Sequence, residues 1–412
     1  MDEHHGFGIP HAGHQRPIGH AQMRAANLGL VLRYLRDHGG RSRAELAAET
    51  GLSKATITNV IAGLAGVGLI EEGDVEHHRR VGRPGIEIRL RPDGARGLGI
   101  ELARHHLALS VVNFVGEPMM EHTVALSADP DDADGVVREA AELVRRVLDE
   151  LDAPVAACTL AAPGLIDYQR GTVRLAPALG WTDAQVAPSF ASQLDGALPI
   201  YIENDAKLAA LSSLVEHRDA KVRDLVHVTG GAGIGLGVIA DGRLLRGGAG
   251  YSGELGHTTL DADGPRCPCG RRGCLELAVG WPAFCRRLAQ AGIDVSPDRS
   301  LGEQLEALRA QMQAGDEAIA SAAGATAEDL ARGLQSVVDL FNPKVLVLGG
   351  YFGYLGELLV PVLQRRFDQA SIDPGTHVDV TTCGHGLQAA ARGGAVMALE
   401  RVFLDPTVVR TT

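Results

Sequence analysis

One histidine and three cysteines lie within 18 residues of one another, in the spacing H-x9-C-x-C-x4-C. The four residues are His257, Cys267, Cys269 and Cys274. Glycines at 270 and 273 allow the segment to turn back, so that all four side chains can face one point. Three thiolates and one imidazole form a closed tetrahedral zinc site, so we expect Zn²⁺ in a structural role. The alternative is a group of reduced surface thiols that binds no metal.

Two glutamates, Glu254 and Glu276, bracket the same segment. If one ring nitrogen of His257 binds the metal, the other nitrogen needs a different partner. Carboxylates accept hydrogen bonds and an imidazole N–H donates one, and the hydroxyls of a sugar need both kinds of partner. These three side chains therefore predict a sugar-binding site beside the metal.

The motifs around these residues resemble signatures of the ROK family, which groups sugar-responsive repressors with bacterial sugar kinases. They read Gly-x-x-Gly-Glu-x-Gly-His from Gly250 and Cys-x-Cys-Gly-x-x-Gly-Cys-x-Glu from Cys267. The resemblance covers nearly the whole chain. It implies an α/β protein with a two-lobed, actin-like (ribonuclease-H-like) sugar-kinase fold.

The pair Asn204-Asp205 is similar to the family's Asn-Asp pair, in which the aspartate of a kinase is the base that acts on the sugar hydroxyl. In a repressor the same two side chains would only hydrogen-bond the sugar. Lys207 stands where the family frequently has asparagine. The sugar-binding residues implied by the resemblance and by the motifs are Asn204, Asp205, Glu254, His257 and Glu276.

The hairpin that holds ATP phosphates in the family's kinases is altered in this chain. The kinases have an aspartate followed by Gly-Gly-Thr, whereas this chain reads Glu101-Leu-Ala-Arg104-His105. Side chains fill the place where phosphate would meet bare backbone, and the threonine is absent. The resemblance therefore implies a protein that is not an enzyme and has no catalytic residue, with Asp205 as the equivalent of the kinase base. A sugar kinase that carries a DNA-binding domain is the alternative.

Length and composition are those of an ordinary globular protein. The 412 residues can form two or three domains, and 45% of them are apolar and 22% charged. No apolar run reaches the length of a transmembrane helix, and residues 1–20 lack the apolar centre of a signal peptide. We expect a cytoplasmic protein with a disordered arm over residues 1–20 and no membrane partner.

The charge is unevenly spread, although the net charge is −12. Residues 21–92 contain 11 lysines and arginines against 8 acidic residues, a balance of +3. A basic module attached to an acidic body indicates that this end meets a polyanion.

The same region predicts a winged helix-turn-helix. Helical apolar spacing over 21–38 is followed by a short helix over 43–50 and by a third helix that Ser53 caps. The third helix would enter the major groove, and strands over 69–73 and 85–90 would form a wing with a basic loop. The alternatives are a three-helix module that only dimerises and a loop that is only solvated. The residues predicted to contact DNA are Lys54, Thr56, Thr58, Asn59, Arg79, Arg80 and Arg83.

The predicted domains are the arm over 1–20, the winged helix-turn-helix over 21–92, a first lobe from 95–203 and 386–412, and a second lobe over 204–385 with the zinc segment. The leading hypothesis is a repressor of carbohydrate metabolism, a homodimer or dimer of dimers. It would bind operator DNA and respond to a sugar or sugar derivative held between the lobes. A third interpretation, a DNA-binding scaffold that has lost its ligand, is disfavoured because the polar residues of the sugar site are retained.

Overall fold

The computed structural model describes residues 20–75, 86–153, 155–218, 220–293, 295, 301–373, 375 and 377–406. The chain divides into two compact units, one of residues 1–94 with 400–412 and the other of residues 95–399. Residues 1–19 of the predicted arm lie outside the described residues. None of the helices in the described ranges is long and apolar enough to cross a membrane.

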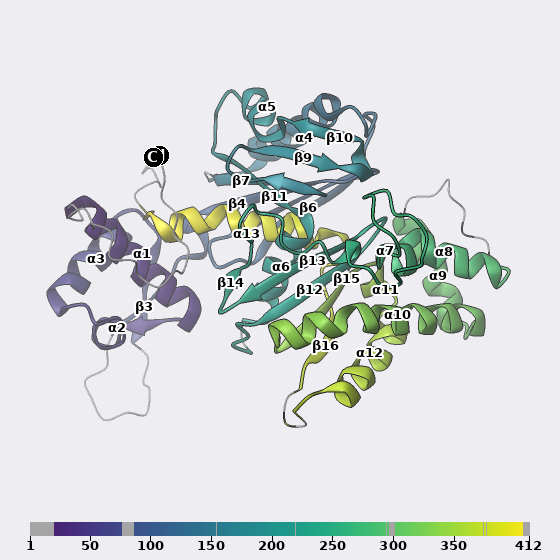
Figure 1. Ribbon diagram of the computed structural model, residues 1–412. Helices are drawn as coiled ribbons and strands as arrows, with labels where there is room; N and C mark the ends of the chain where they lie inside the picture. Colours follow the sequence, from purple (N-terminus) through teal and green to yellow (C-terminus); the bar gives the residue numbers. More distant parts are fainter. Residues whose placement is uncertain are drawn as a thin grey trace. The chain divides into compact units, whose positions relative to one another are not determined.

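The N-terminal unit contains the predicted helix-turn-helix and its wing strands (purple in Figure 1). Its elements are α1 (His20–His38), β1 (Arg41–Ser42), α2 (Arg43–Thr50), α3 (Lys54–Gly66), β2 (Ile70–Val75), β3 (Ile86–Leu90) and the 3-10 turn η1 (Pro92–Gly94). The strands form an antiparallel sheet in the order β1-β3-β2. The three helices are confirmed, whereas the two-residue strand β1 was not predicted.

Local hydrogen bonds set the starts of α2 and α3. Ser42 Oγ accepts the amide of Glu45, and the Glu45 carboxylate accepts the amide of Ser42 at 2.9 Å, which is a capping box. Ser53 Oγ accepts the amide of Thr56 at 3.1 Å. The predicted apolar stripe of α3 is buried and fixes which face the helix presents to solvent; it consists of Ile57, Val60, Ile61 and Leu64.

The end of helix α13 (Ala389–Leu404) also belongs to the N-terminal unit. Arg36 on α1 donates to Glu400 Oε1 at 2.5 Å, and its guanidinium lies 4.7 Å from the centre of the Phe403 ring. Arg33 donates to the Phe403 carbonyl at 2.7 Å. The prediction placed all of 386–412 in the first lobe, whereas Glu400 and Phe403 contact α1 and the division between the two units falls at Glu400.

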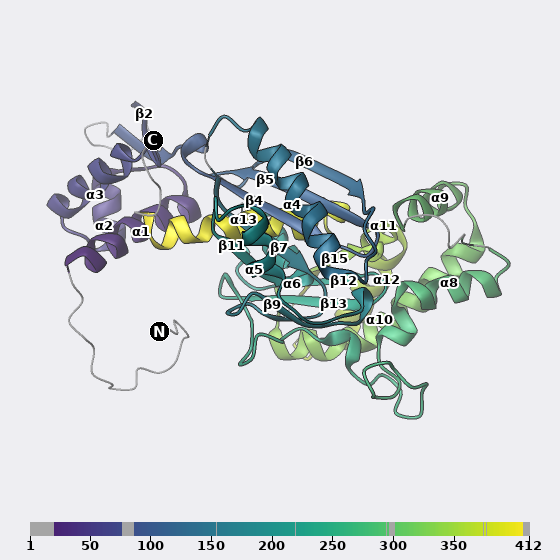
Figure 2. The ribbon, with the colours of Figure 1, turned by 90° about the horizontal axis from the view of Figure 1, so that it is seen from above.

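The first lobe of the second unit is built on the sheet β11-β7-β4-β5-β6, which α4 crosses in the view of Figure 2. Its elements are β4 (Arg96–Leu102), β5 (His106–Asn113), β6 (Pro118–Ala125), α4 (Ala133–Glu150), β7 (Val155–Ala162), β8 (Leu165–Asp167), β9 (Thr172–Ala176), η2 (Pro177–Leu179), β10 (Trp181–Ala184), α5 (Val186–Gln193) and β11 (Ile200–Asn204). Strands β10, β9 and β8 form a small separate sheet that the sequence did not predict.

The second lobe is built on the sheet β14-β13-β12-β15-β16. Its elements are α6 (Asp205–Glu216), β12 (Leu225–Gly230), β13 (Ile234–Ala240), β14 (Arg243–Leu244), η3 (Leu255–His257), α7 (Glu276–Val279), α8 (Trp281–Gln290), α9 (Leu301–Gln313), α10 (Glu317–Phe341), β15 (Val345–Gly350), α11 (Tyr351–Tyr354), α12 (Gly356–Ala370), β16 (Asp379–Thr382) and η4 (Gly386–Gln388).

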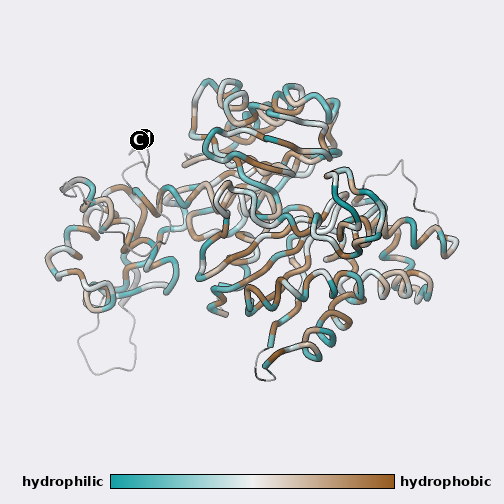
Figure 3. Tube along the Cα trace, viewed as in Figure 1, coloured by the Kyte–Doolittle hydropathy of each residue, from teal (hydrophilic) through white to brown (hydrophobic). Residues whose placement is uncertain are grey.

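The two five-stranded sheets follow one plan. In each sheet the first three strands pair antiparallel and the third strand then pairs in parallel with the fourth, as does the fourth with the fifth. The strand orders are β6-β5-β4-β7-β11 in one lobe and β14-β13-β12-β15-β16 in the other. The inner strands are largely hydrophobic (Figure 3), as expected for sheets covered on both faces. This duplicated α/β architecture is the predicted two-lobed sugar-kinase fold.

Glycines on the sheets let two helices approach closely. A Cβ atom on Gly99 of β4 would lie 1.9 Å from the Ala391 carbonyl of α13, and one on Gly237 of β13 would lie 2.5 Å from the Ala206 carbonyl of α6. Because those contacts leave no room for a side chain, each helix packs directly against strand backbone. The close packing of α6 fixes its first residue, Asp205, beside the second-lobe sheet.

Candidate functional site

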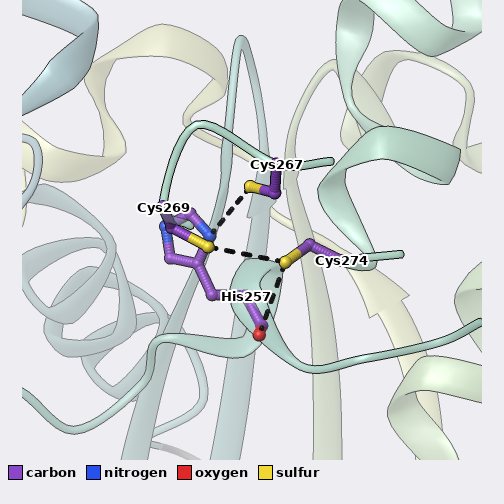
Figure 4. A group of neighbouring side chains, drawn as sticks. All are labelled: His257, Cys267, Cys269 and Cys274. Carbon is purple, nitrogen blue, oxygen red and sulfur yellow. Dashed lines mark hydrogen bonds between the residues drawn. The ribbon is translucent and has the colours of Figure 1, made fainter. Parts of the chain in front are cut away.

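The side chains of the predicted metal ligands point toward one another (Figure 4). One ligand atom from each of His257, Cys267, Cys269 and Cys274 lies within 4.8 Å of those of the other three. The sulfurs of Cys269 and Cys274 are 3.6 Å apart, and the Cys267 sulfur is 3.8 Å from His257 Nδ1. The structure therefore brings all four predicted ligands to one point.

These separations fit a tetrahedral metal centre. Bonds of about 2.3 Å to sulfur and about 2.0 Å to nitrogen place neighbouring ligand atoms about 3.5–3.8 Å apart. The backbone supports the arrangement, because Gly273 has a φ of +57° and a Cβ there would lie 1.6 Å from the Asp261 carbonyl. The Cys267 amide donates to the Arg271 carbonyl at 2.9 Å, which closes the turn between the cysteines. The four residues can thus hold a metal ion.

The glutamates that bracket this loop lie close to it. Glu276 Oε1 lies 3.0 Å from the Cys267 sulfur and 3.3 Å from His257 Nδ1. His257 therefore turns Nδ1 toward the cysteines and leaves Nε2 for another partner. Glu254 interacts electrostatically with His257, Glu276 and Asp205, and burial raises the pKa of its carboxyl.

Asn204 and Asp205 lie at the junction of β11 and α6. Asn204 Oδ1 accepts the amide of Lys207 at 3.1 Å, and its Nδ2 donates to the Gly164 carbonyl at 3.2 Å. Asn204 therefore caps α6 and joins it to the loop after β7. Asp205 Oδ1 accepts the amide of Ala206 at 2.8 Å, and burial raises the pKa of Asp205. Two residues later, the Lys207 ammonium donates to the Gly250 carbonyl, so α6 begins close to the loop that carries Glu254.

Two residues that the sequence analysis did not assign to the site interact electrostatically with Asp205. Burial, followed by the charge of Asp205, raises the pKa of Glu101 on β4 to about 8. The ammonium of Lys207 donates to the Gly250 carbonyl and lies 4.0 Å from Glu203 Oε1; burial lowers its pKa. Each left a signal in the sequence, because Glu101 interrupts an apolar strand and Lys207 interrupts an apolar helix.

In the altered hairpin between β4 and β5, the side chain of Arg104 is held by hydrogen bonds to other segments. Arg104 NH1 donates to the Ala178 carbonyl at 2.7 Å and to Asp131 Oδ1 at 3.1 Å. The turn is closed by a hydrogen bond from the Ala103 amide to the His106 carbonyl at 3.1 Å. Arg104 thus connects the hairpin to η2, which contains Ala178.

Aromatic side chains pack together directly after β15. Tyr351 and Phe352 follow Gly350 and are fully buried. The Tyr351 ring lies 5.3 Å from that of Trp281 and 5.7 Å from that of Phe284, measured between ring centres. Its hydroxyl donates to the Val279 carbonyl. The sequence analysis did not anticipate this packed cluster.

The predicted reader helix exposes the residues expected to contact DNA. Lys54, Thr58 and Asn59 are exposed and Thr56 is half-buried on α3. The Thr58 hydroxyl donates to the Lys54 carbonyl at 2.9 Å, whereas the Thr56 hydroxyl lies 2.9 Å from Ser53 Oγ at the cap. The predicted wing arginines Arg79, Arg80 and Arg83 lie outside the described residues.

A winged helix-turn-helix and a two-lobed body with the sugar-kinase fold define a class of DNA-binding transcriptional regulators that respond to sugars. Comparison with known families matches residues 97–401 to the ROK family and residues 29–81 to the MarR family. The ROK match covers well over half of the chain, and the chain belongs to the ROK family.

Relatives of both functional branches are similar to this chain. The xylose repressor of Caldicellulosiruptor bescii is 28% identical over 369 residues, covering 85% of this chain and 90% of the repressor. A solved ROK family transcriptional regulator, a homolog of the E. coli MLC protein, has a TM-score of 0.76 at 26% identity and covers 94% of this chain and 99% of its own. A ROK family glucokinase from Streptomyces griseus, solved with glucose and AMPPNP, has a TM-score of 0.64 at 25% identity and covers 74% and 100%. The regulators match nearly the whole chain, whereas the kinase matches about three quarters.

We expect the substitution Cys269→Ser to weaken zinc binding by at least about tenfold, because loss of even an outer-shell partner costs about 10–100-fold. Zinc content after dialysis against a chelator measures the effect. The matched control is Cys285→Ser, since Cys285 lies outside the cluster and is half-buried on α8. Equal zinc retention by the two variants would contradict the metal assignment.

Proposed function

We propose that this protein is a transcriptional repressor of carbohydrate genes whose affinity for operator DNA is set by a sugar. The sugar would be bound by Asn204, Asp205, Glu254, His257 and Glu276. The observation that carries the proposal is that His257 contacts Glu276, and that a hydrogen bond from Lys207 to Gly250 ties the start of α6, with Asn204 and Asp205, to the loop that carries Glu254, in a chain that also presents an exposed reader helix. Carboxylates and an imidazole edge from three segments suit the hydroxyls of a sugar.

We further propose that the four-residue cluster holds Zn²⁺ and that the metal is structural. All four positions of a tetrahedral ion would be taken by protein ligands, so none remains for a substrate. The metal would supply loop rigidity. His257 would then connect the two sites, with Nδ1 on the metal and Nε2 on the sugar.

We also propose that the protein does not phosphorylate the sugar that it binds. One feature supports this: in the hairpin that differs from that of the family's kinases, Arg104 donates to the Ala178 carbonyl and to Asp131. A sugar kinase with a DNA-binding domain remains the alternative, because Asp205 is retained and the likeness to the glucokinase is extensive.

We propose a homodimer or dimer of dimers that acts in the cytoplasm on operator DNA. Winged-helix regulators read two half-sites related by symmetry, so two copies of α3 are needed for one operator. A sugar or sugar derivative would be the signal.

Substitution of Asn59 should change which DNA sequences the protein selects. Asn59 is exposed in the middle of α3, and loss of one base contact changes discrimination at that base by about 1–3 kcal/mol. Binding-site selection from random duplex DNA would compare the wild type, Asn59→Ala and the control Ala65→Ser, which alters an exposed position near the end of α3. If the wild type retains no duplex DNA at low salt, the DNA-binding proposal is wrong.

The variant Glu254→Ala should keep metal and DNA binding and lose the response to sugar. A coupling free energy of about 1–3 kcal/mol corresponds to a change of about 5- to 150-fold in operator affinity when sugar is added. Operator binding would be titrated with D-xylose, D-glucose and other monosaccharides. Asp263→Ala, on the exposed part of the same loop, is the control and should respond normally. A normal response from Glu254→Ala would remove Glu254 from the effector site.

No monosaccharide should be phosphorylated at a useful rate. A coupled assay with ATP and magnesium across hexoses, pentoses and amino sugars measures this. Turnover within the common enzyme range of about 1–1,000 per second on any sugar would favour the kinase alternative.

A further inference from the structure

A loop of the second lobe contacts the first lobe just before the effector-site residue Glu254. We call its residues, 246–252, the clasp loop. The loop closes on itself, because the Ser252 amide donates to the Arg246 carbonyl at 3.1 Å. The Arg246 side chain reaches the first lobe: it donates to Glu203 Oε2 of β11 at 2.7 Å, and its guanidinium lies 5.3 Å from the centre of the Tyr168 ring.

Gly250 brings the clasp loop against the first lobe at a second point. Its φ is +83°, in the left-handed region, and a Cβ built on it would lie 3.3 Å from the Ile166 carbonyl oxygen and 3.3 Å from the Tyr168 ring. A side chain would therefore be strained and would crowd the residues of β8 and the turn after it. The Gly250 carbonyl accepts a hydrogen bond from the Lys207 ammonium.

Lys207 reaches the clasp loop from inside the molecule. It lies in the first turn of α6 and is 2% exposed. An ammonium that is withdrawn from water is costly unless it is paired and hydrogen-bonded. The Gly250 carbonyl and Glu203 Oε1, at 4.0 Å, meet that need. An apolar residue would be less costly to bury here, so the charge is explained by what it holds.

Of the two contacts, the one to the loop is the closer. Arg246 already donates to the Glu203 carboxylate at 2.7 Å, whereas the Lys207 ammonium lies 4.0 Å from it and makes its hydrogen bond to the Gly250 carbonyl. Neutralisation of Glu203 therefore does not account for the position of the ammonium. Its direct structural effect is on the clasp loop.

The clasp loop is fixed again immediately before Glu254. Gly253 has a φ of +93°, and a Cβ on it would collide with the Leu236 carbonyl of β13. The backbone is thus held by Lys207 at Gly250 and by β13 at Gly253. With two anchors three residues apart, the segment has little freedom, so both anchors determine where Glu254 lies.

We propose that Lys207 is a positioning residue for the effector site: through the Gly250 carbonyl it holds the clasp loop, and with it Glu254, in the arrangement that binds the sugar. Because Arg246 ties the same loop to Glu203 of the first lobe, effector affinity is linked to the arrangement of the lobes in which these contacts form. This inference rests on the proposed effector site and adds a means of its regulation.

Titration of the full-length protein with D-xylose and D-glucose tests the effect on binding. Lys207→Met removes the ammonium and keeps an unbranched apolar chain. The sugar that binds the wild type should bind this variant at least about tenfold more weakly, the size of one hydrogen bond to a charged group, while zinc content stays the same. The control is Arg223→Gln, which removes an exposed guanidinium paired with Asp241 and should bind sugar normally.

The double variant Glu203→Gln, Lys207→Met separates positioning from neutralisation of charge. It removes the buried carboxylate together with the ammonium, so it should melt at a higher temperature than Lys207→Met alone. Its sugar affinity should remain about tenfold below that of the wild type, because the contact to Gly250 is still missing. Recovery of wild-type affinity by the double variant would show that Lys207 only neutralises Glu203, and would overturn the inference.

Hydrogen–deuterium exchange provides a measurement that needs no ligand. The amides of residues 246–252 should exchange about tenfold faster or more in Lys207→Met than in the wild type, whereas those of the metal loop, 267–274, should not change. Equal exchange over 246–252 would mean that Lys207 does not hold the loop. If Lys207→Met does not fold, Arg246→Gln takes its place, since that side chain is half-buried and lies on the same loop.

The failures of the two proposals are distinguishable. Faster exchange of the clasp loop together with normal sugar affinity would overturn the positioning role and leave the proposed effector site intact. A wild-type protein that binds neither sugar, and shows no operator response across the wider monosaccharide panel, would overturn the proposed function and this inference with it.

Discussion

The buried carboxylate of Glu203 connects the parts of the molecule that make the candidate site. It is the last residue but one of β11 and has no exposed surface, and a charge so placed needs partners because its desolvation is costly. Arg246 and Lys207 supply them, at 2.7 Å and 4.0 Å from the two carboxylate oxygens. Lys207 also donates to Gly250, where the loop that carries Glu254 begins. One buried charge thus holds the start of α6 against the loop, and removing one partner of such a group typically costs about 3–5 kcal/mol.

Elsewhere in the two-lobed unit, some positions lack side chains, so that helices pack on strand backbone, whereas others carry large side chains. Glycines on β4 and β13 let α13 and α6 press directly on the sheets. The phosphate hairpin and the region after β15 instead carry Arg104 and Tyr351. Binding of phosphate by backbone amides requires exposed backbone without side chains, whereas a site that only binds a sugar tolerates large side chains at these positions. The glycines of β13 therefore have a structural explanation that does not depend on a nucleotide.

The candidate site also contains several carboxyl groups that are withdrawn from water and repel one another when ionised. Burial raises the pKa of Asp205, of Glu254 and of Glu101. Such groups destabilise the folded protein when they ionise together, and a ligand with several hydroxyls relieves that cost by hydrogen bonding. In the proposed function, this is the physical basis on which a sugar stabilises one arrangement of the body relative to another, which is what a change in operator affinity requires.

The sequence alone determined the features that depend on near neighbours. The metal ligands fall within 18 residues, so their types and spacing were sufficient to predict that they meet. Helix caps act over three residues, which is why Ser42 and Ser53 marked the starts of α2 and α3 correctly. The family motifs were sufficient to predict the two-lobed fold. The tertiary structure decided the features that join distant segments: β1 pairs with β3 more than 40 residues later, and Lys207 donates to Gly250, 43 residues further along the chain. It also decided that the Asn204 side chain caps α6 and that Tyr351 is buried, because spacing within one segment does not reveal which backbone from another segment will lie against it.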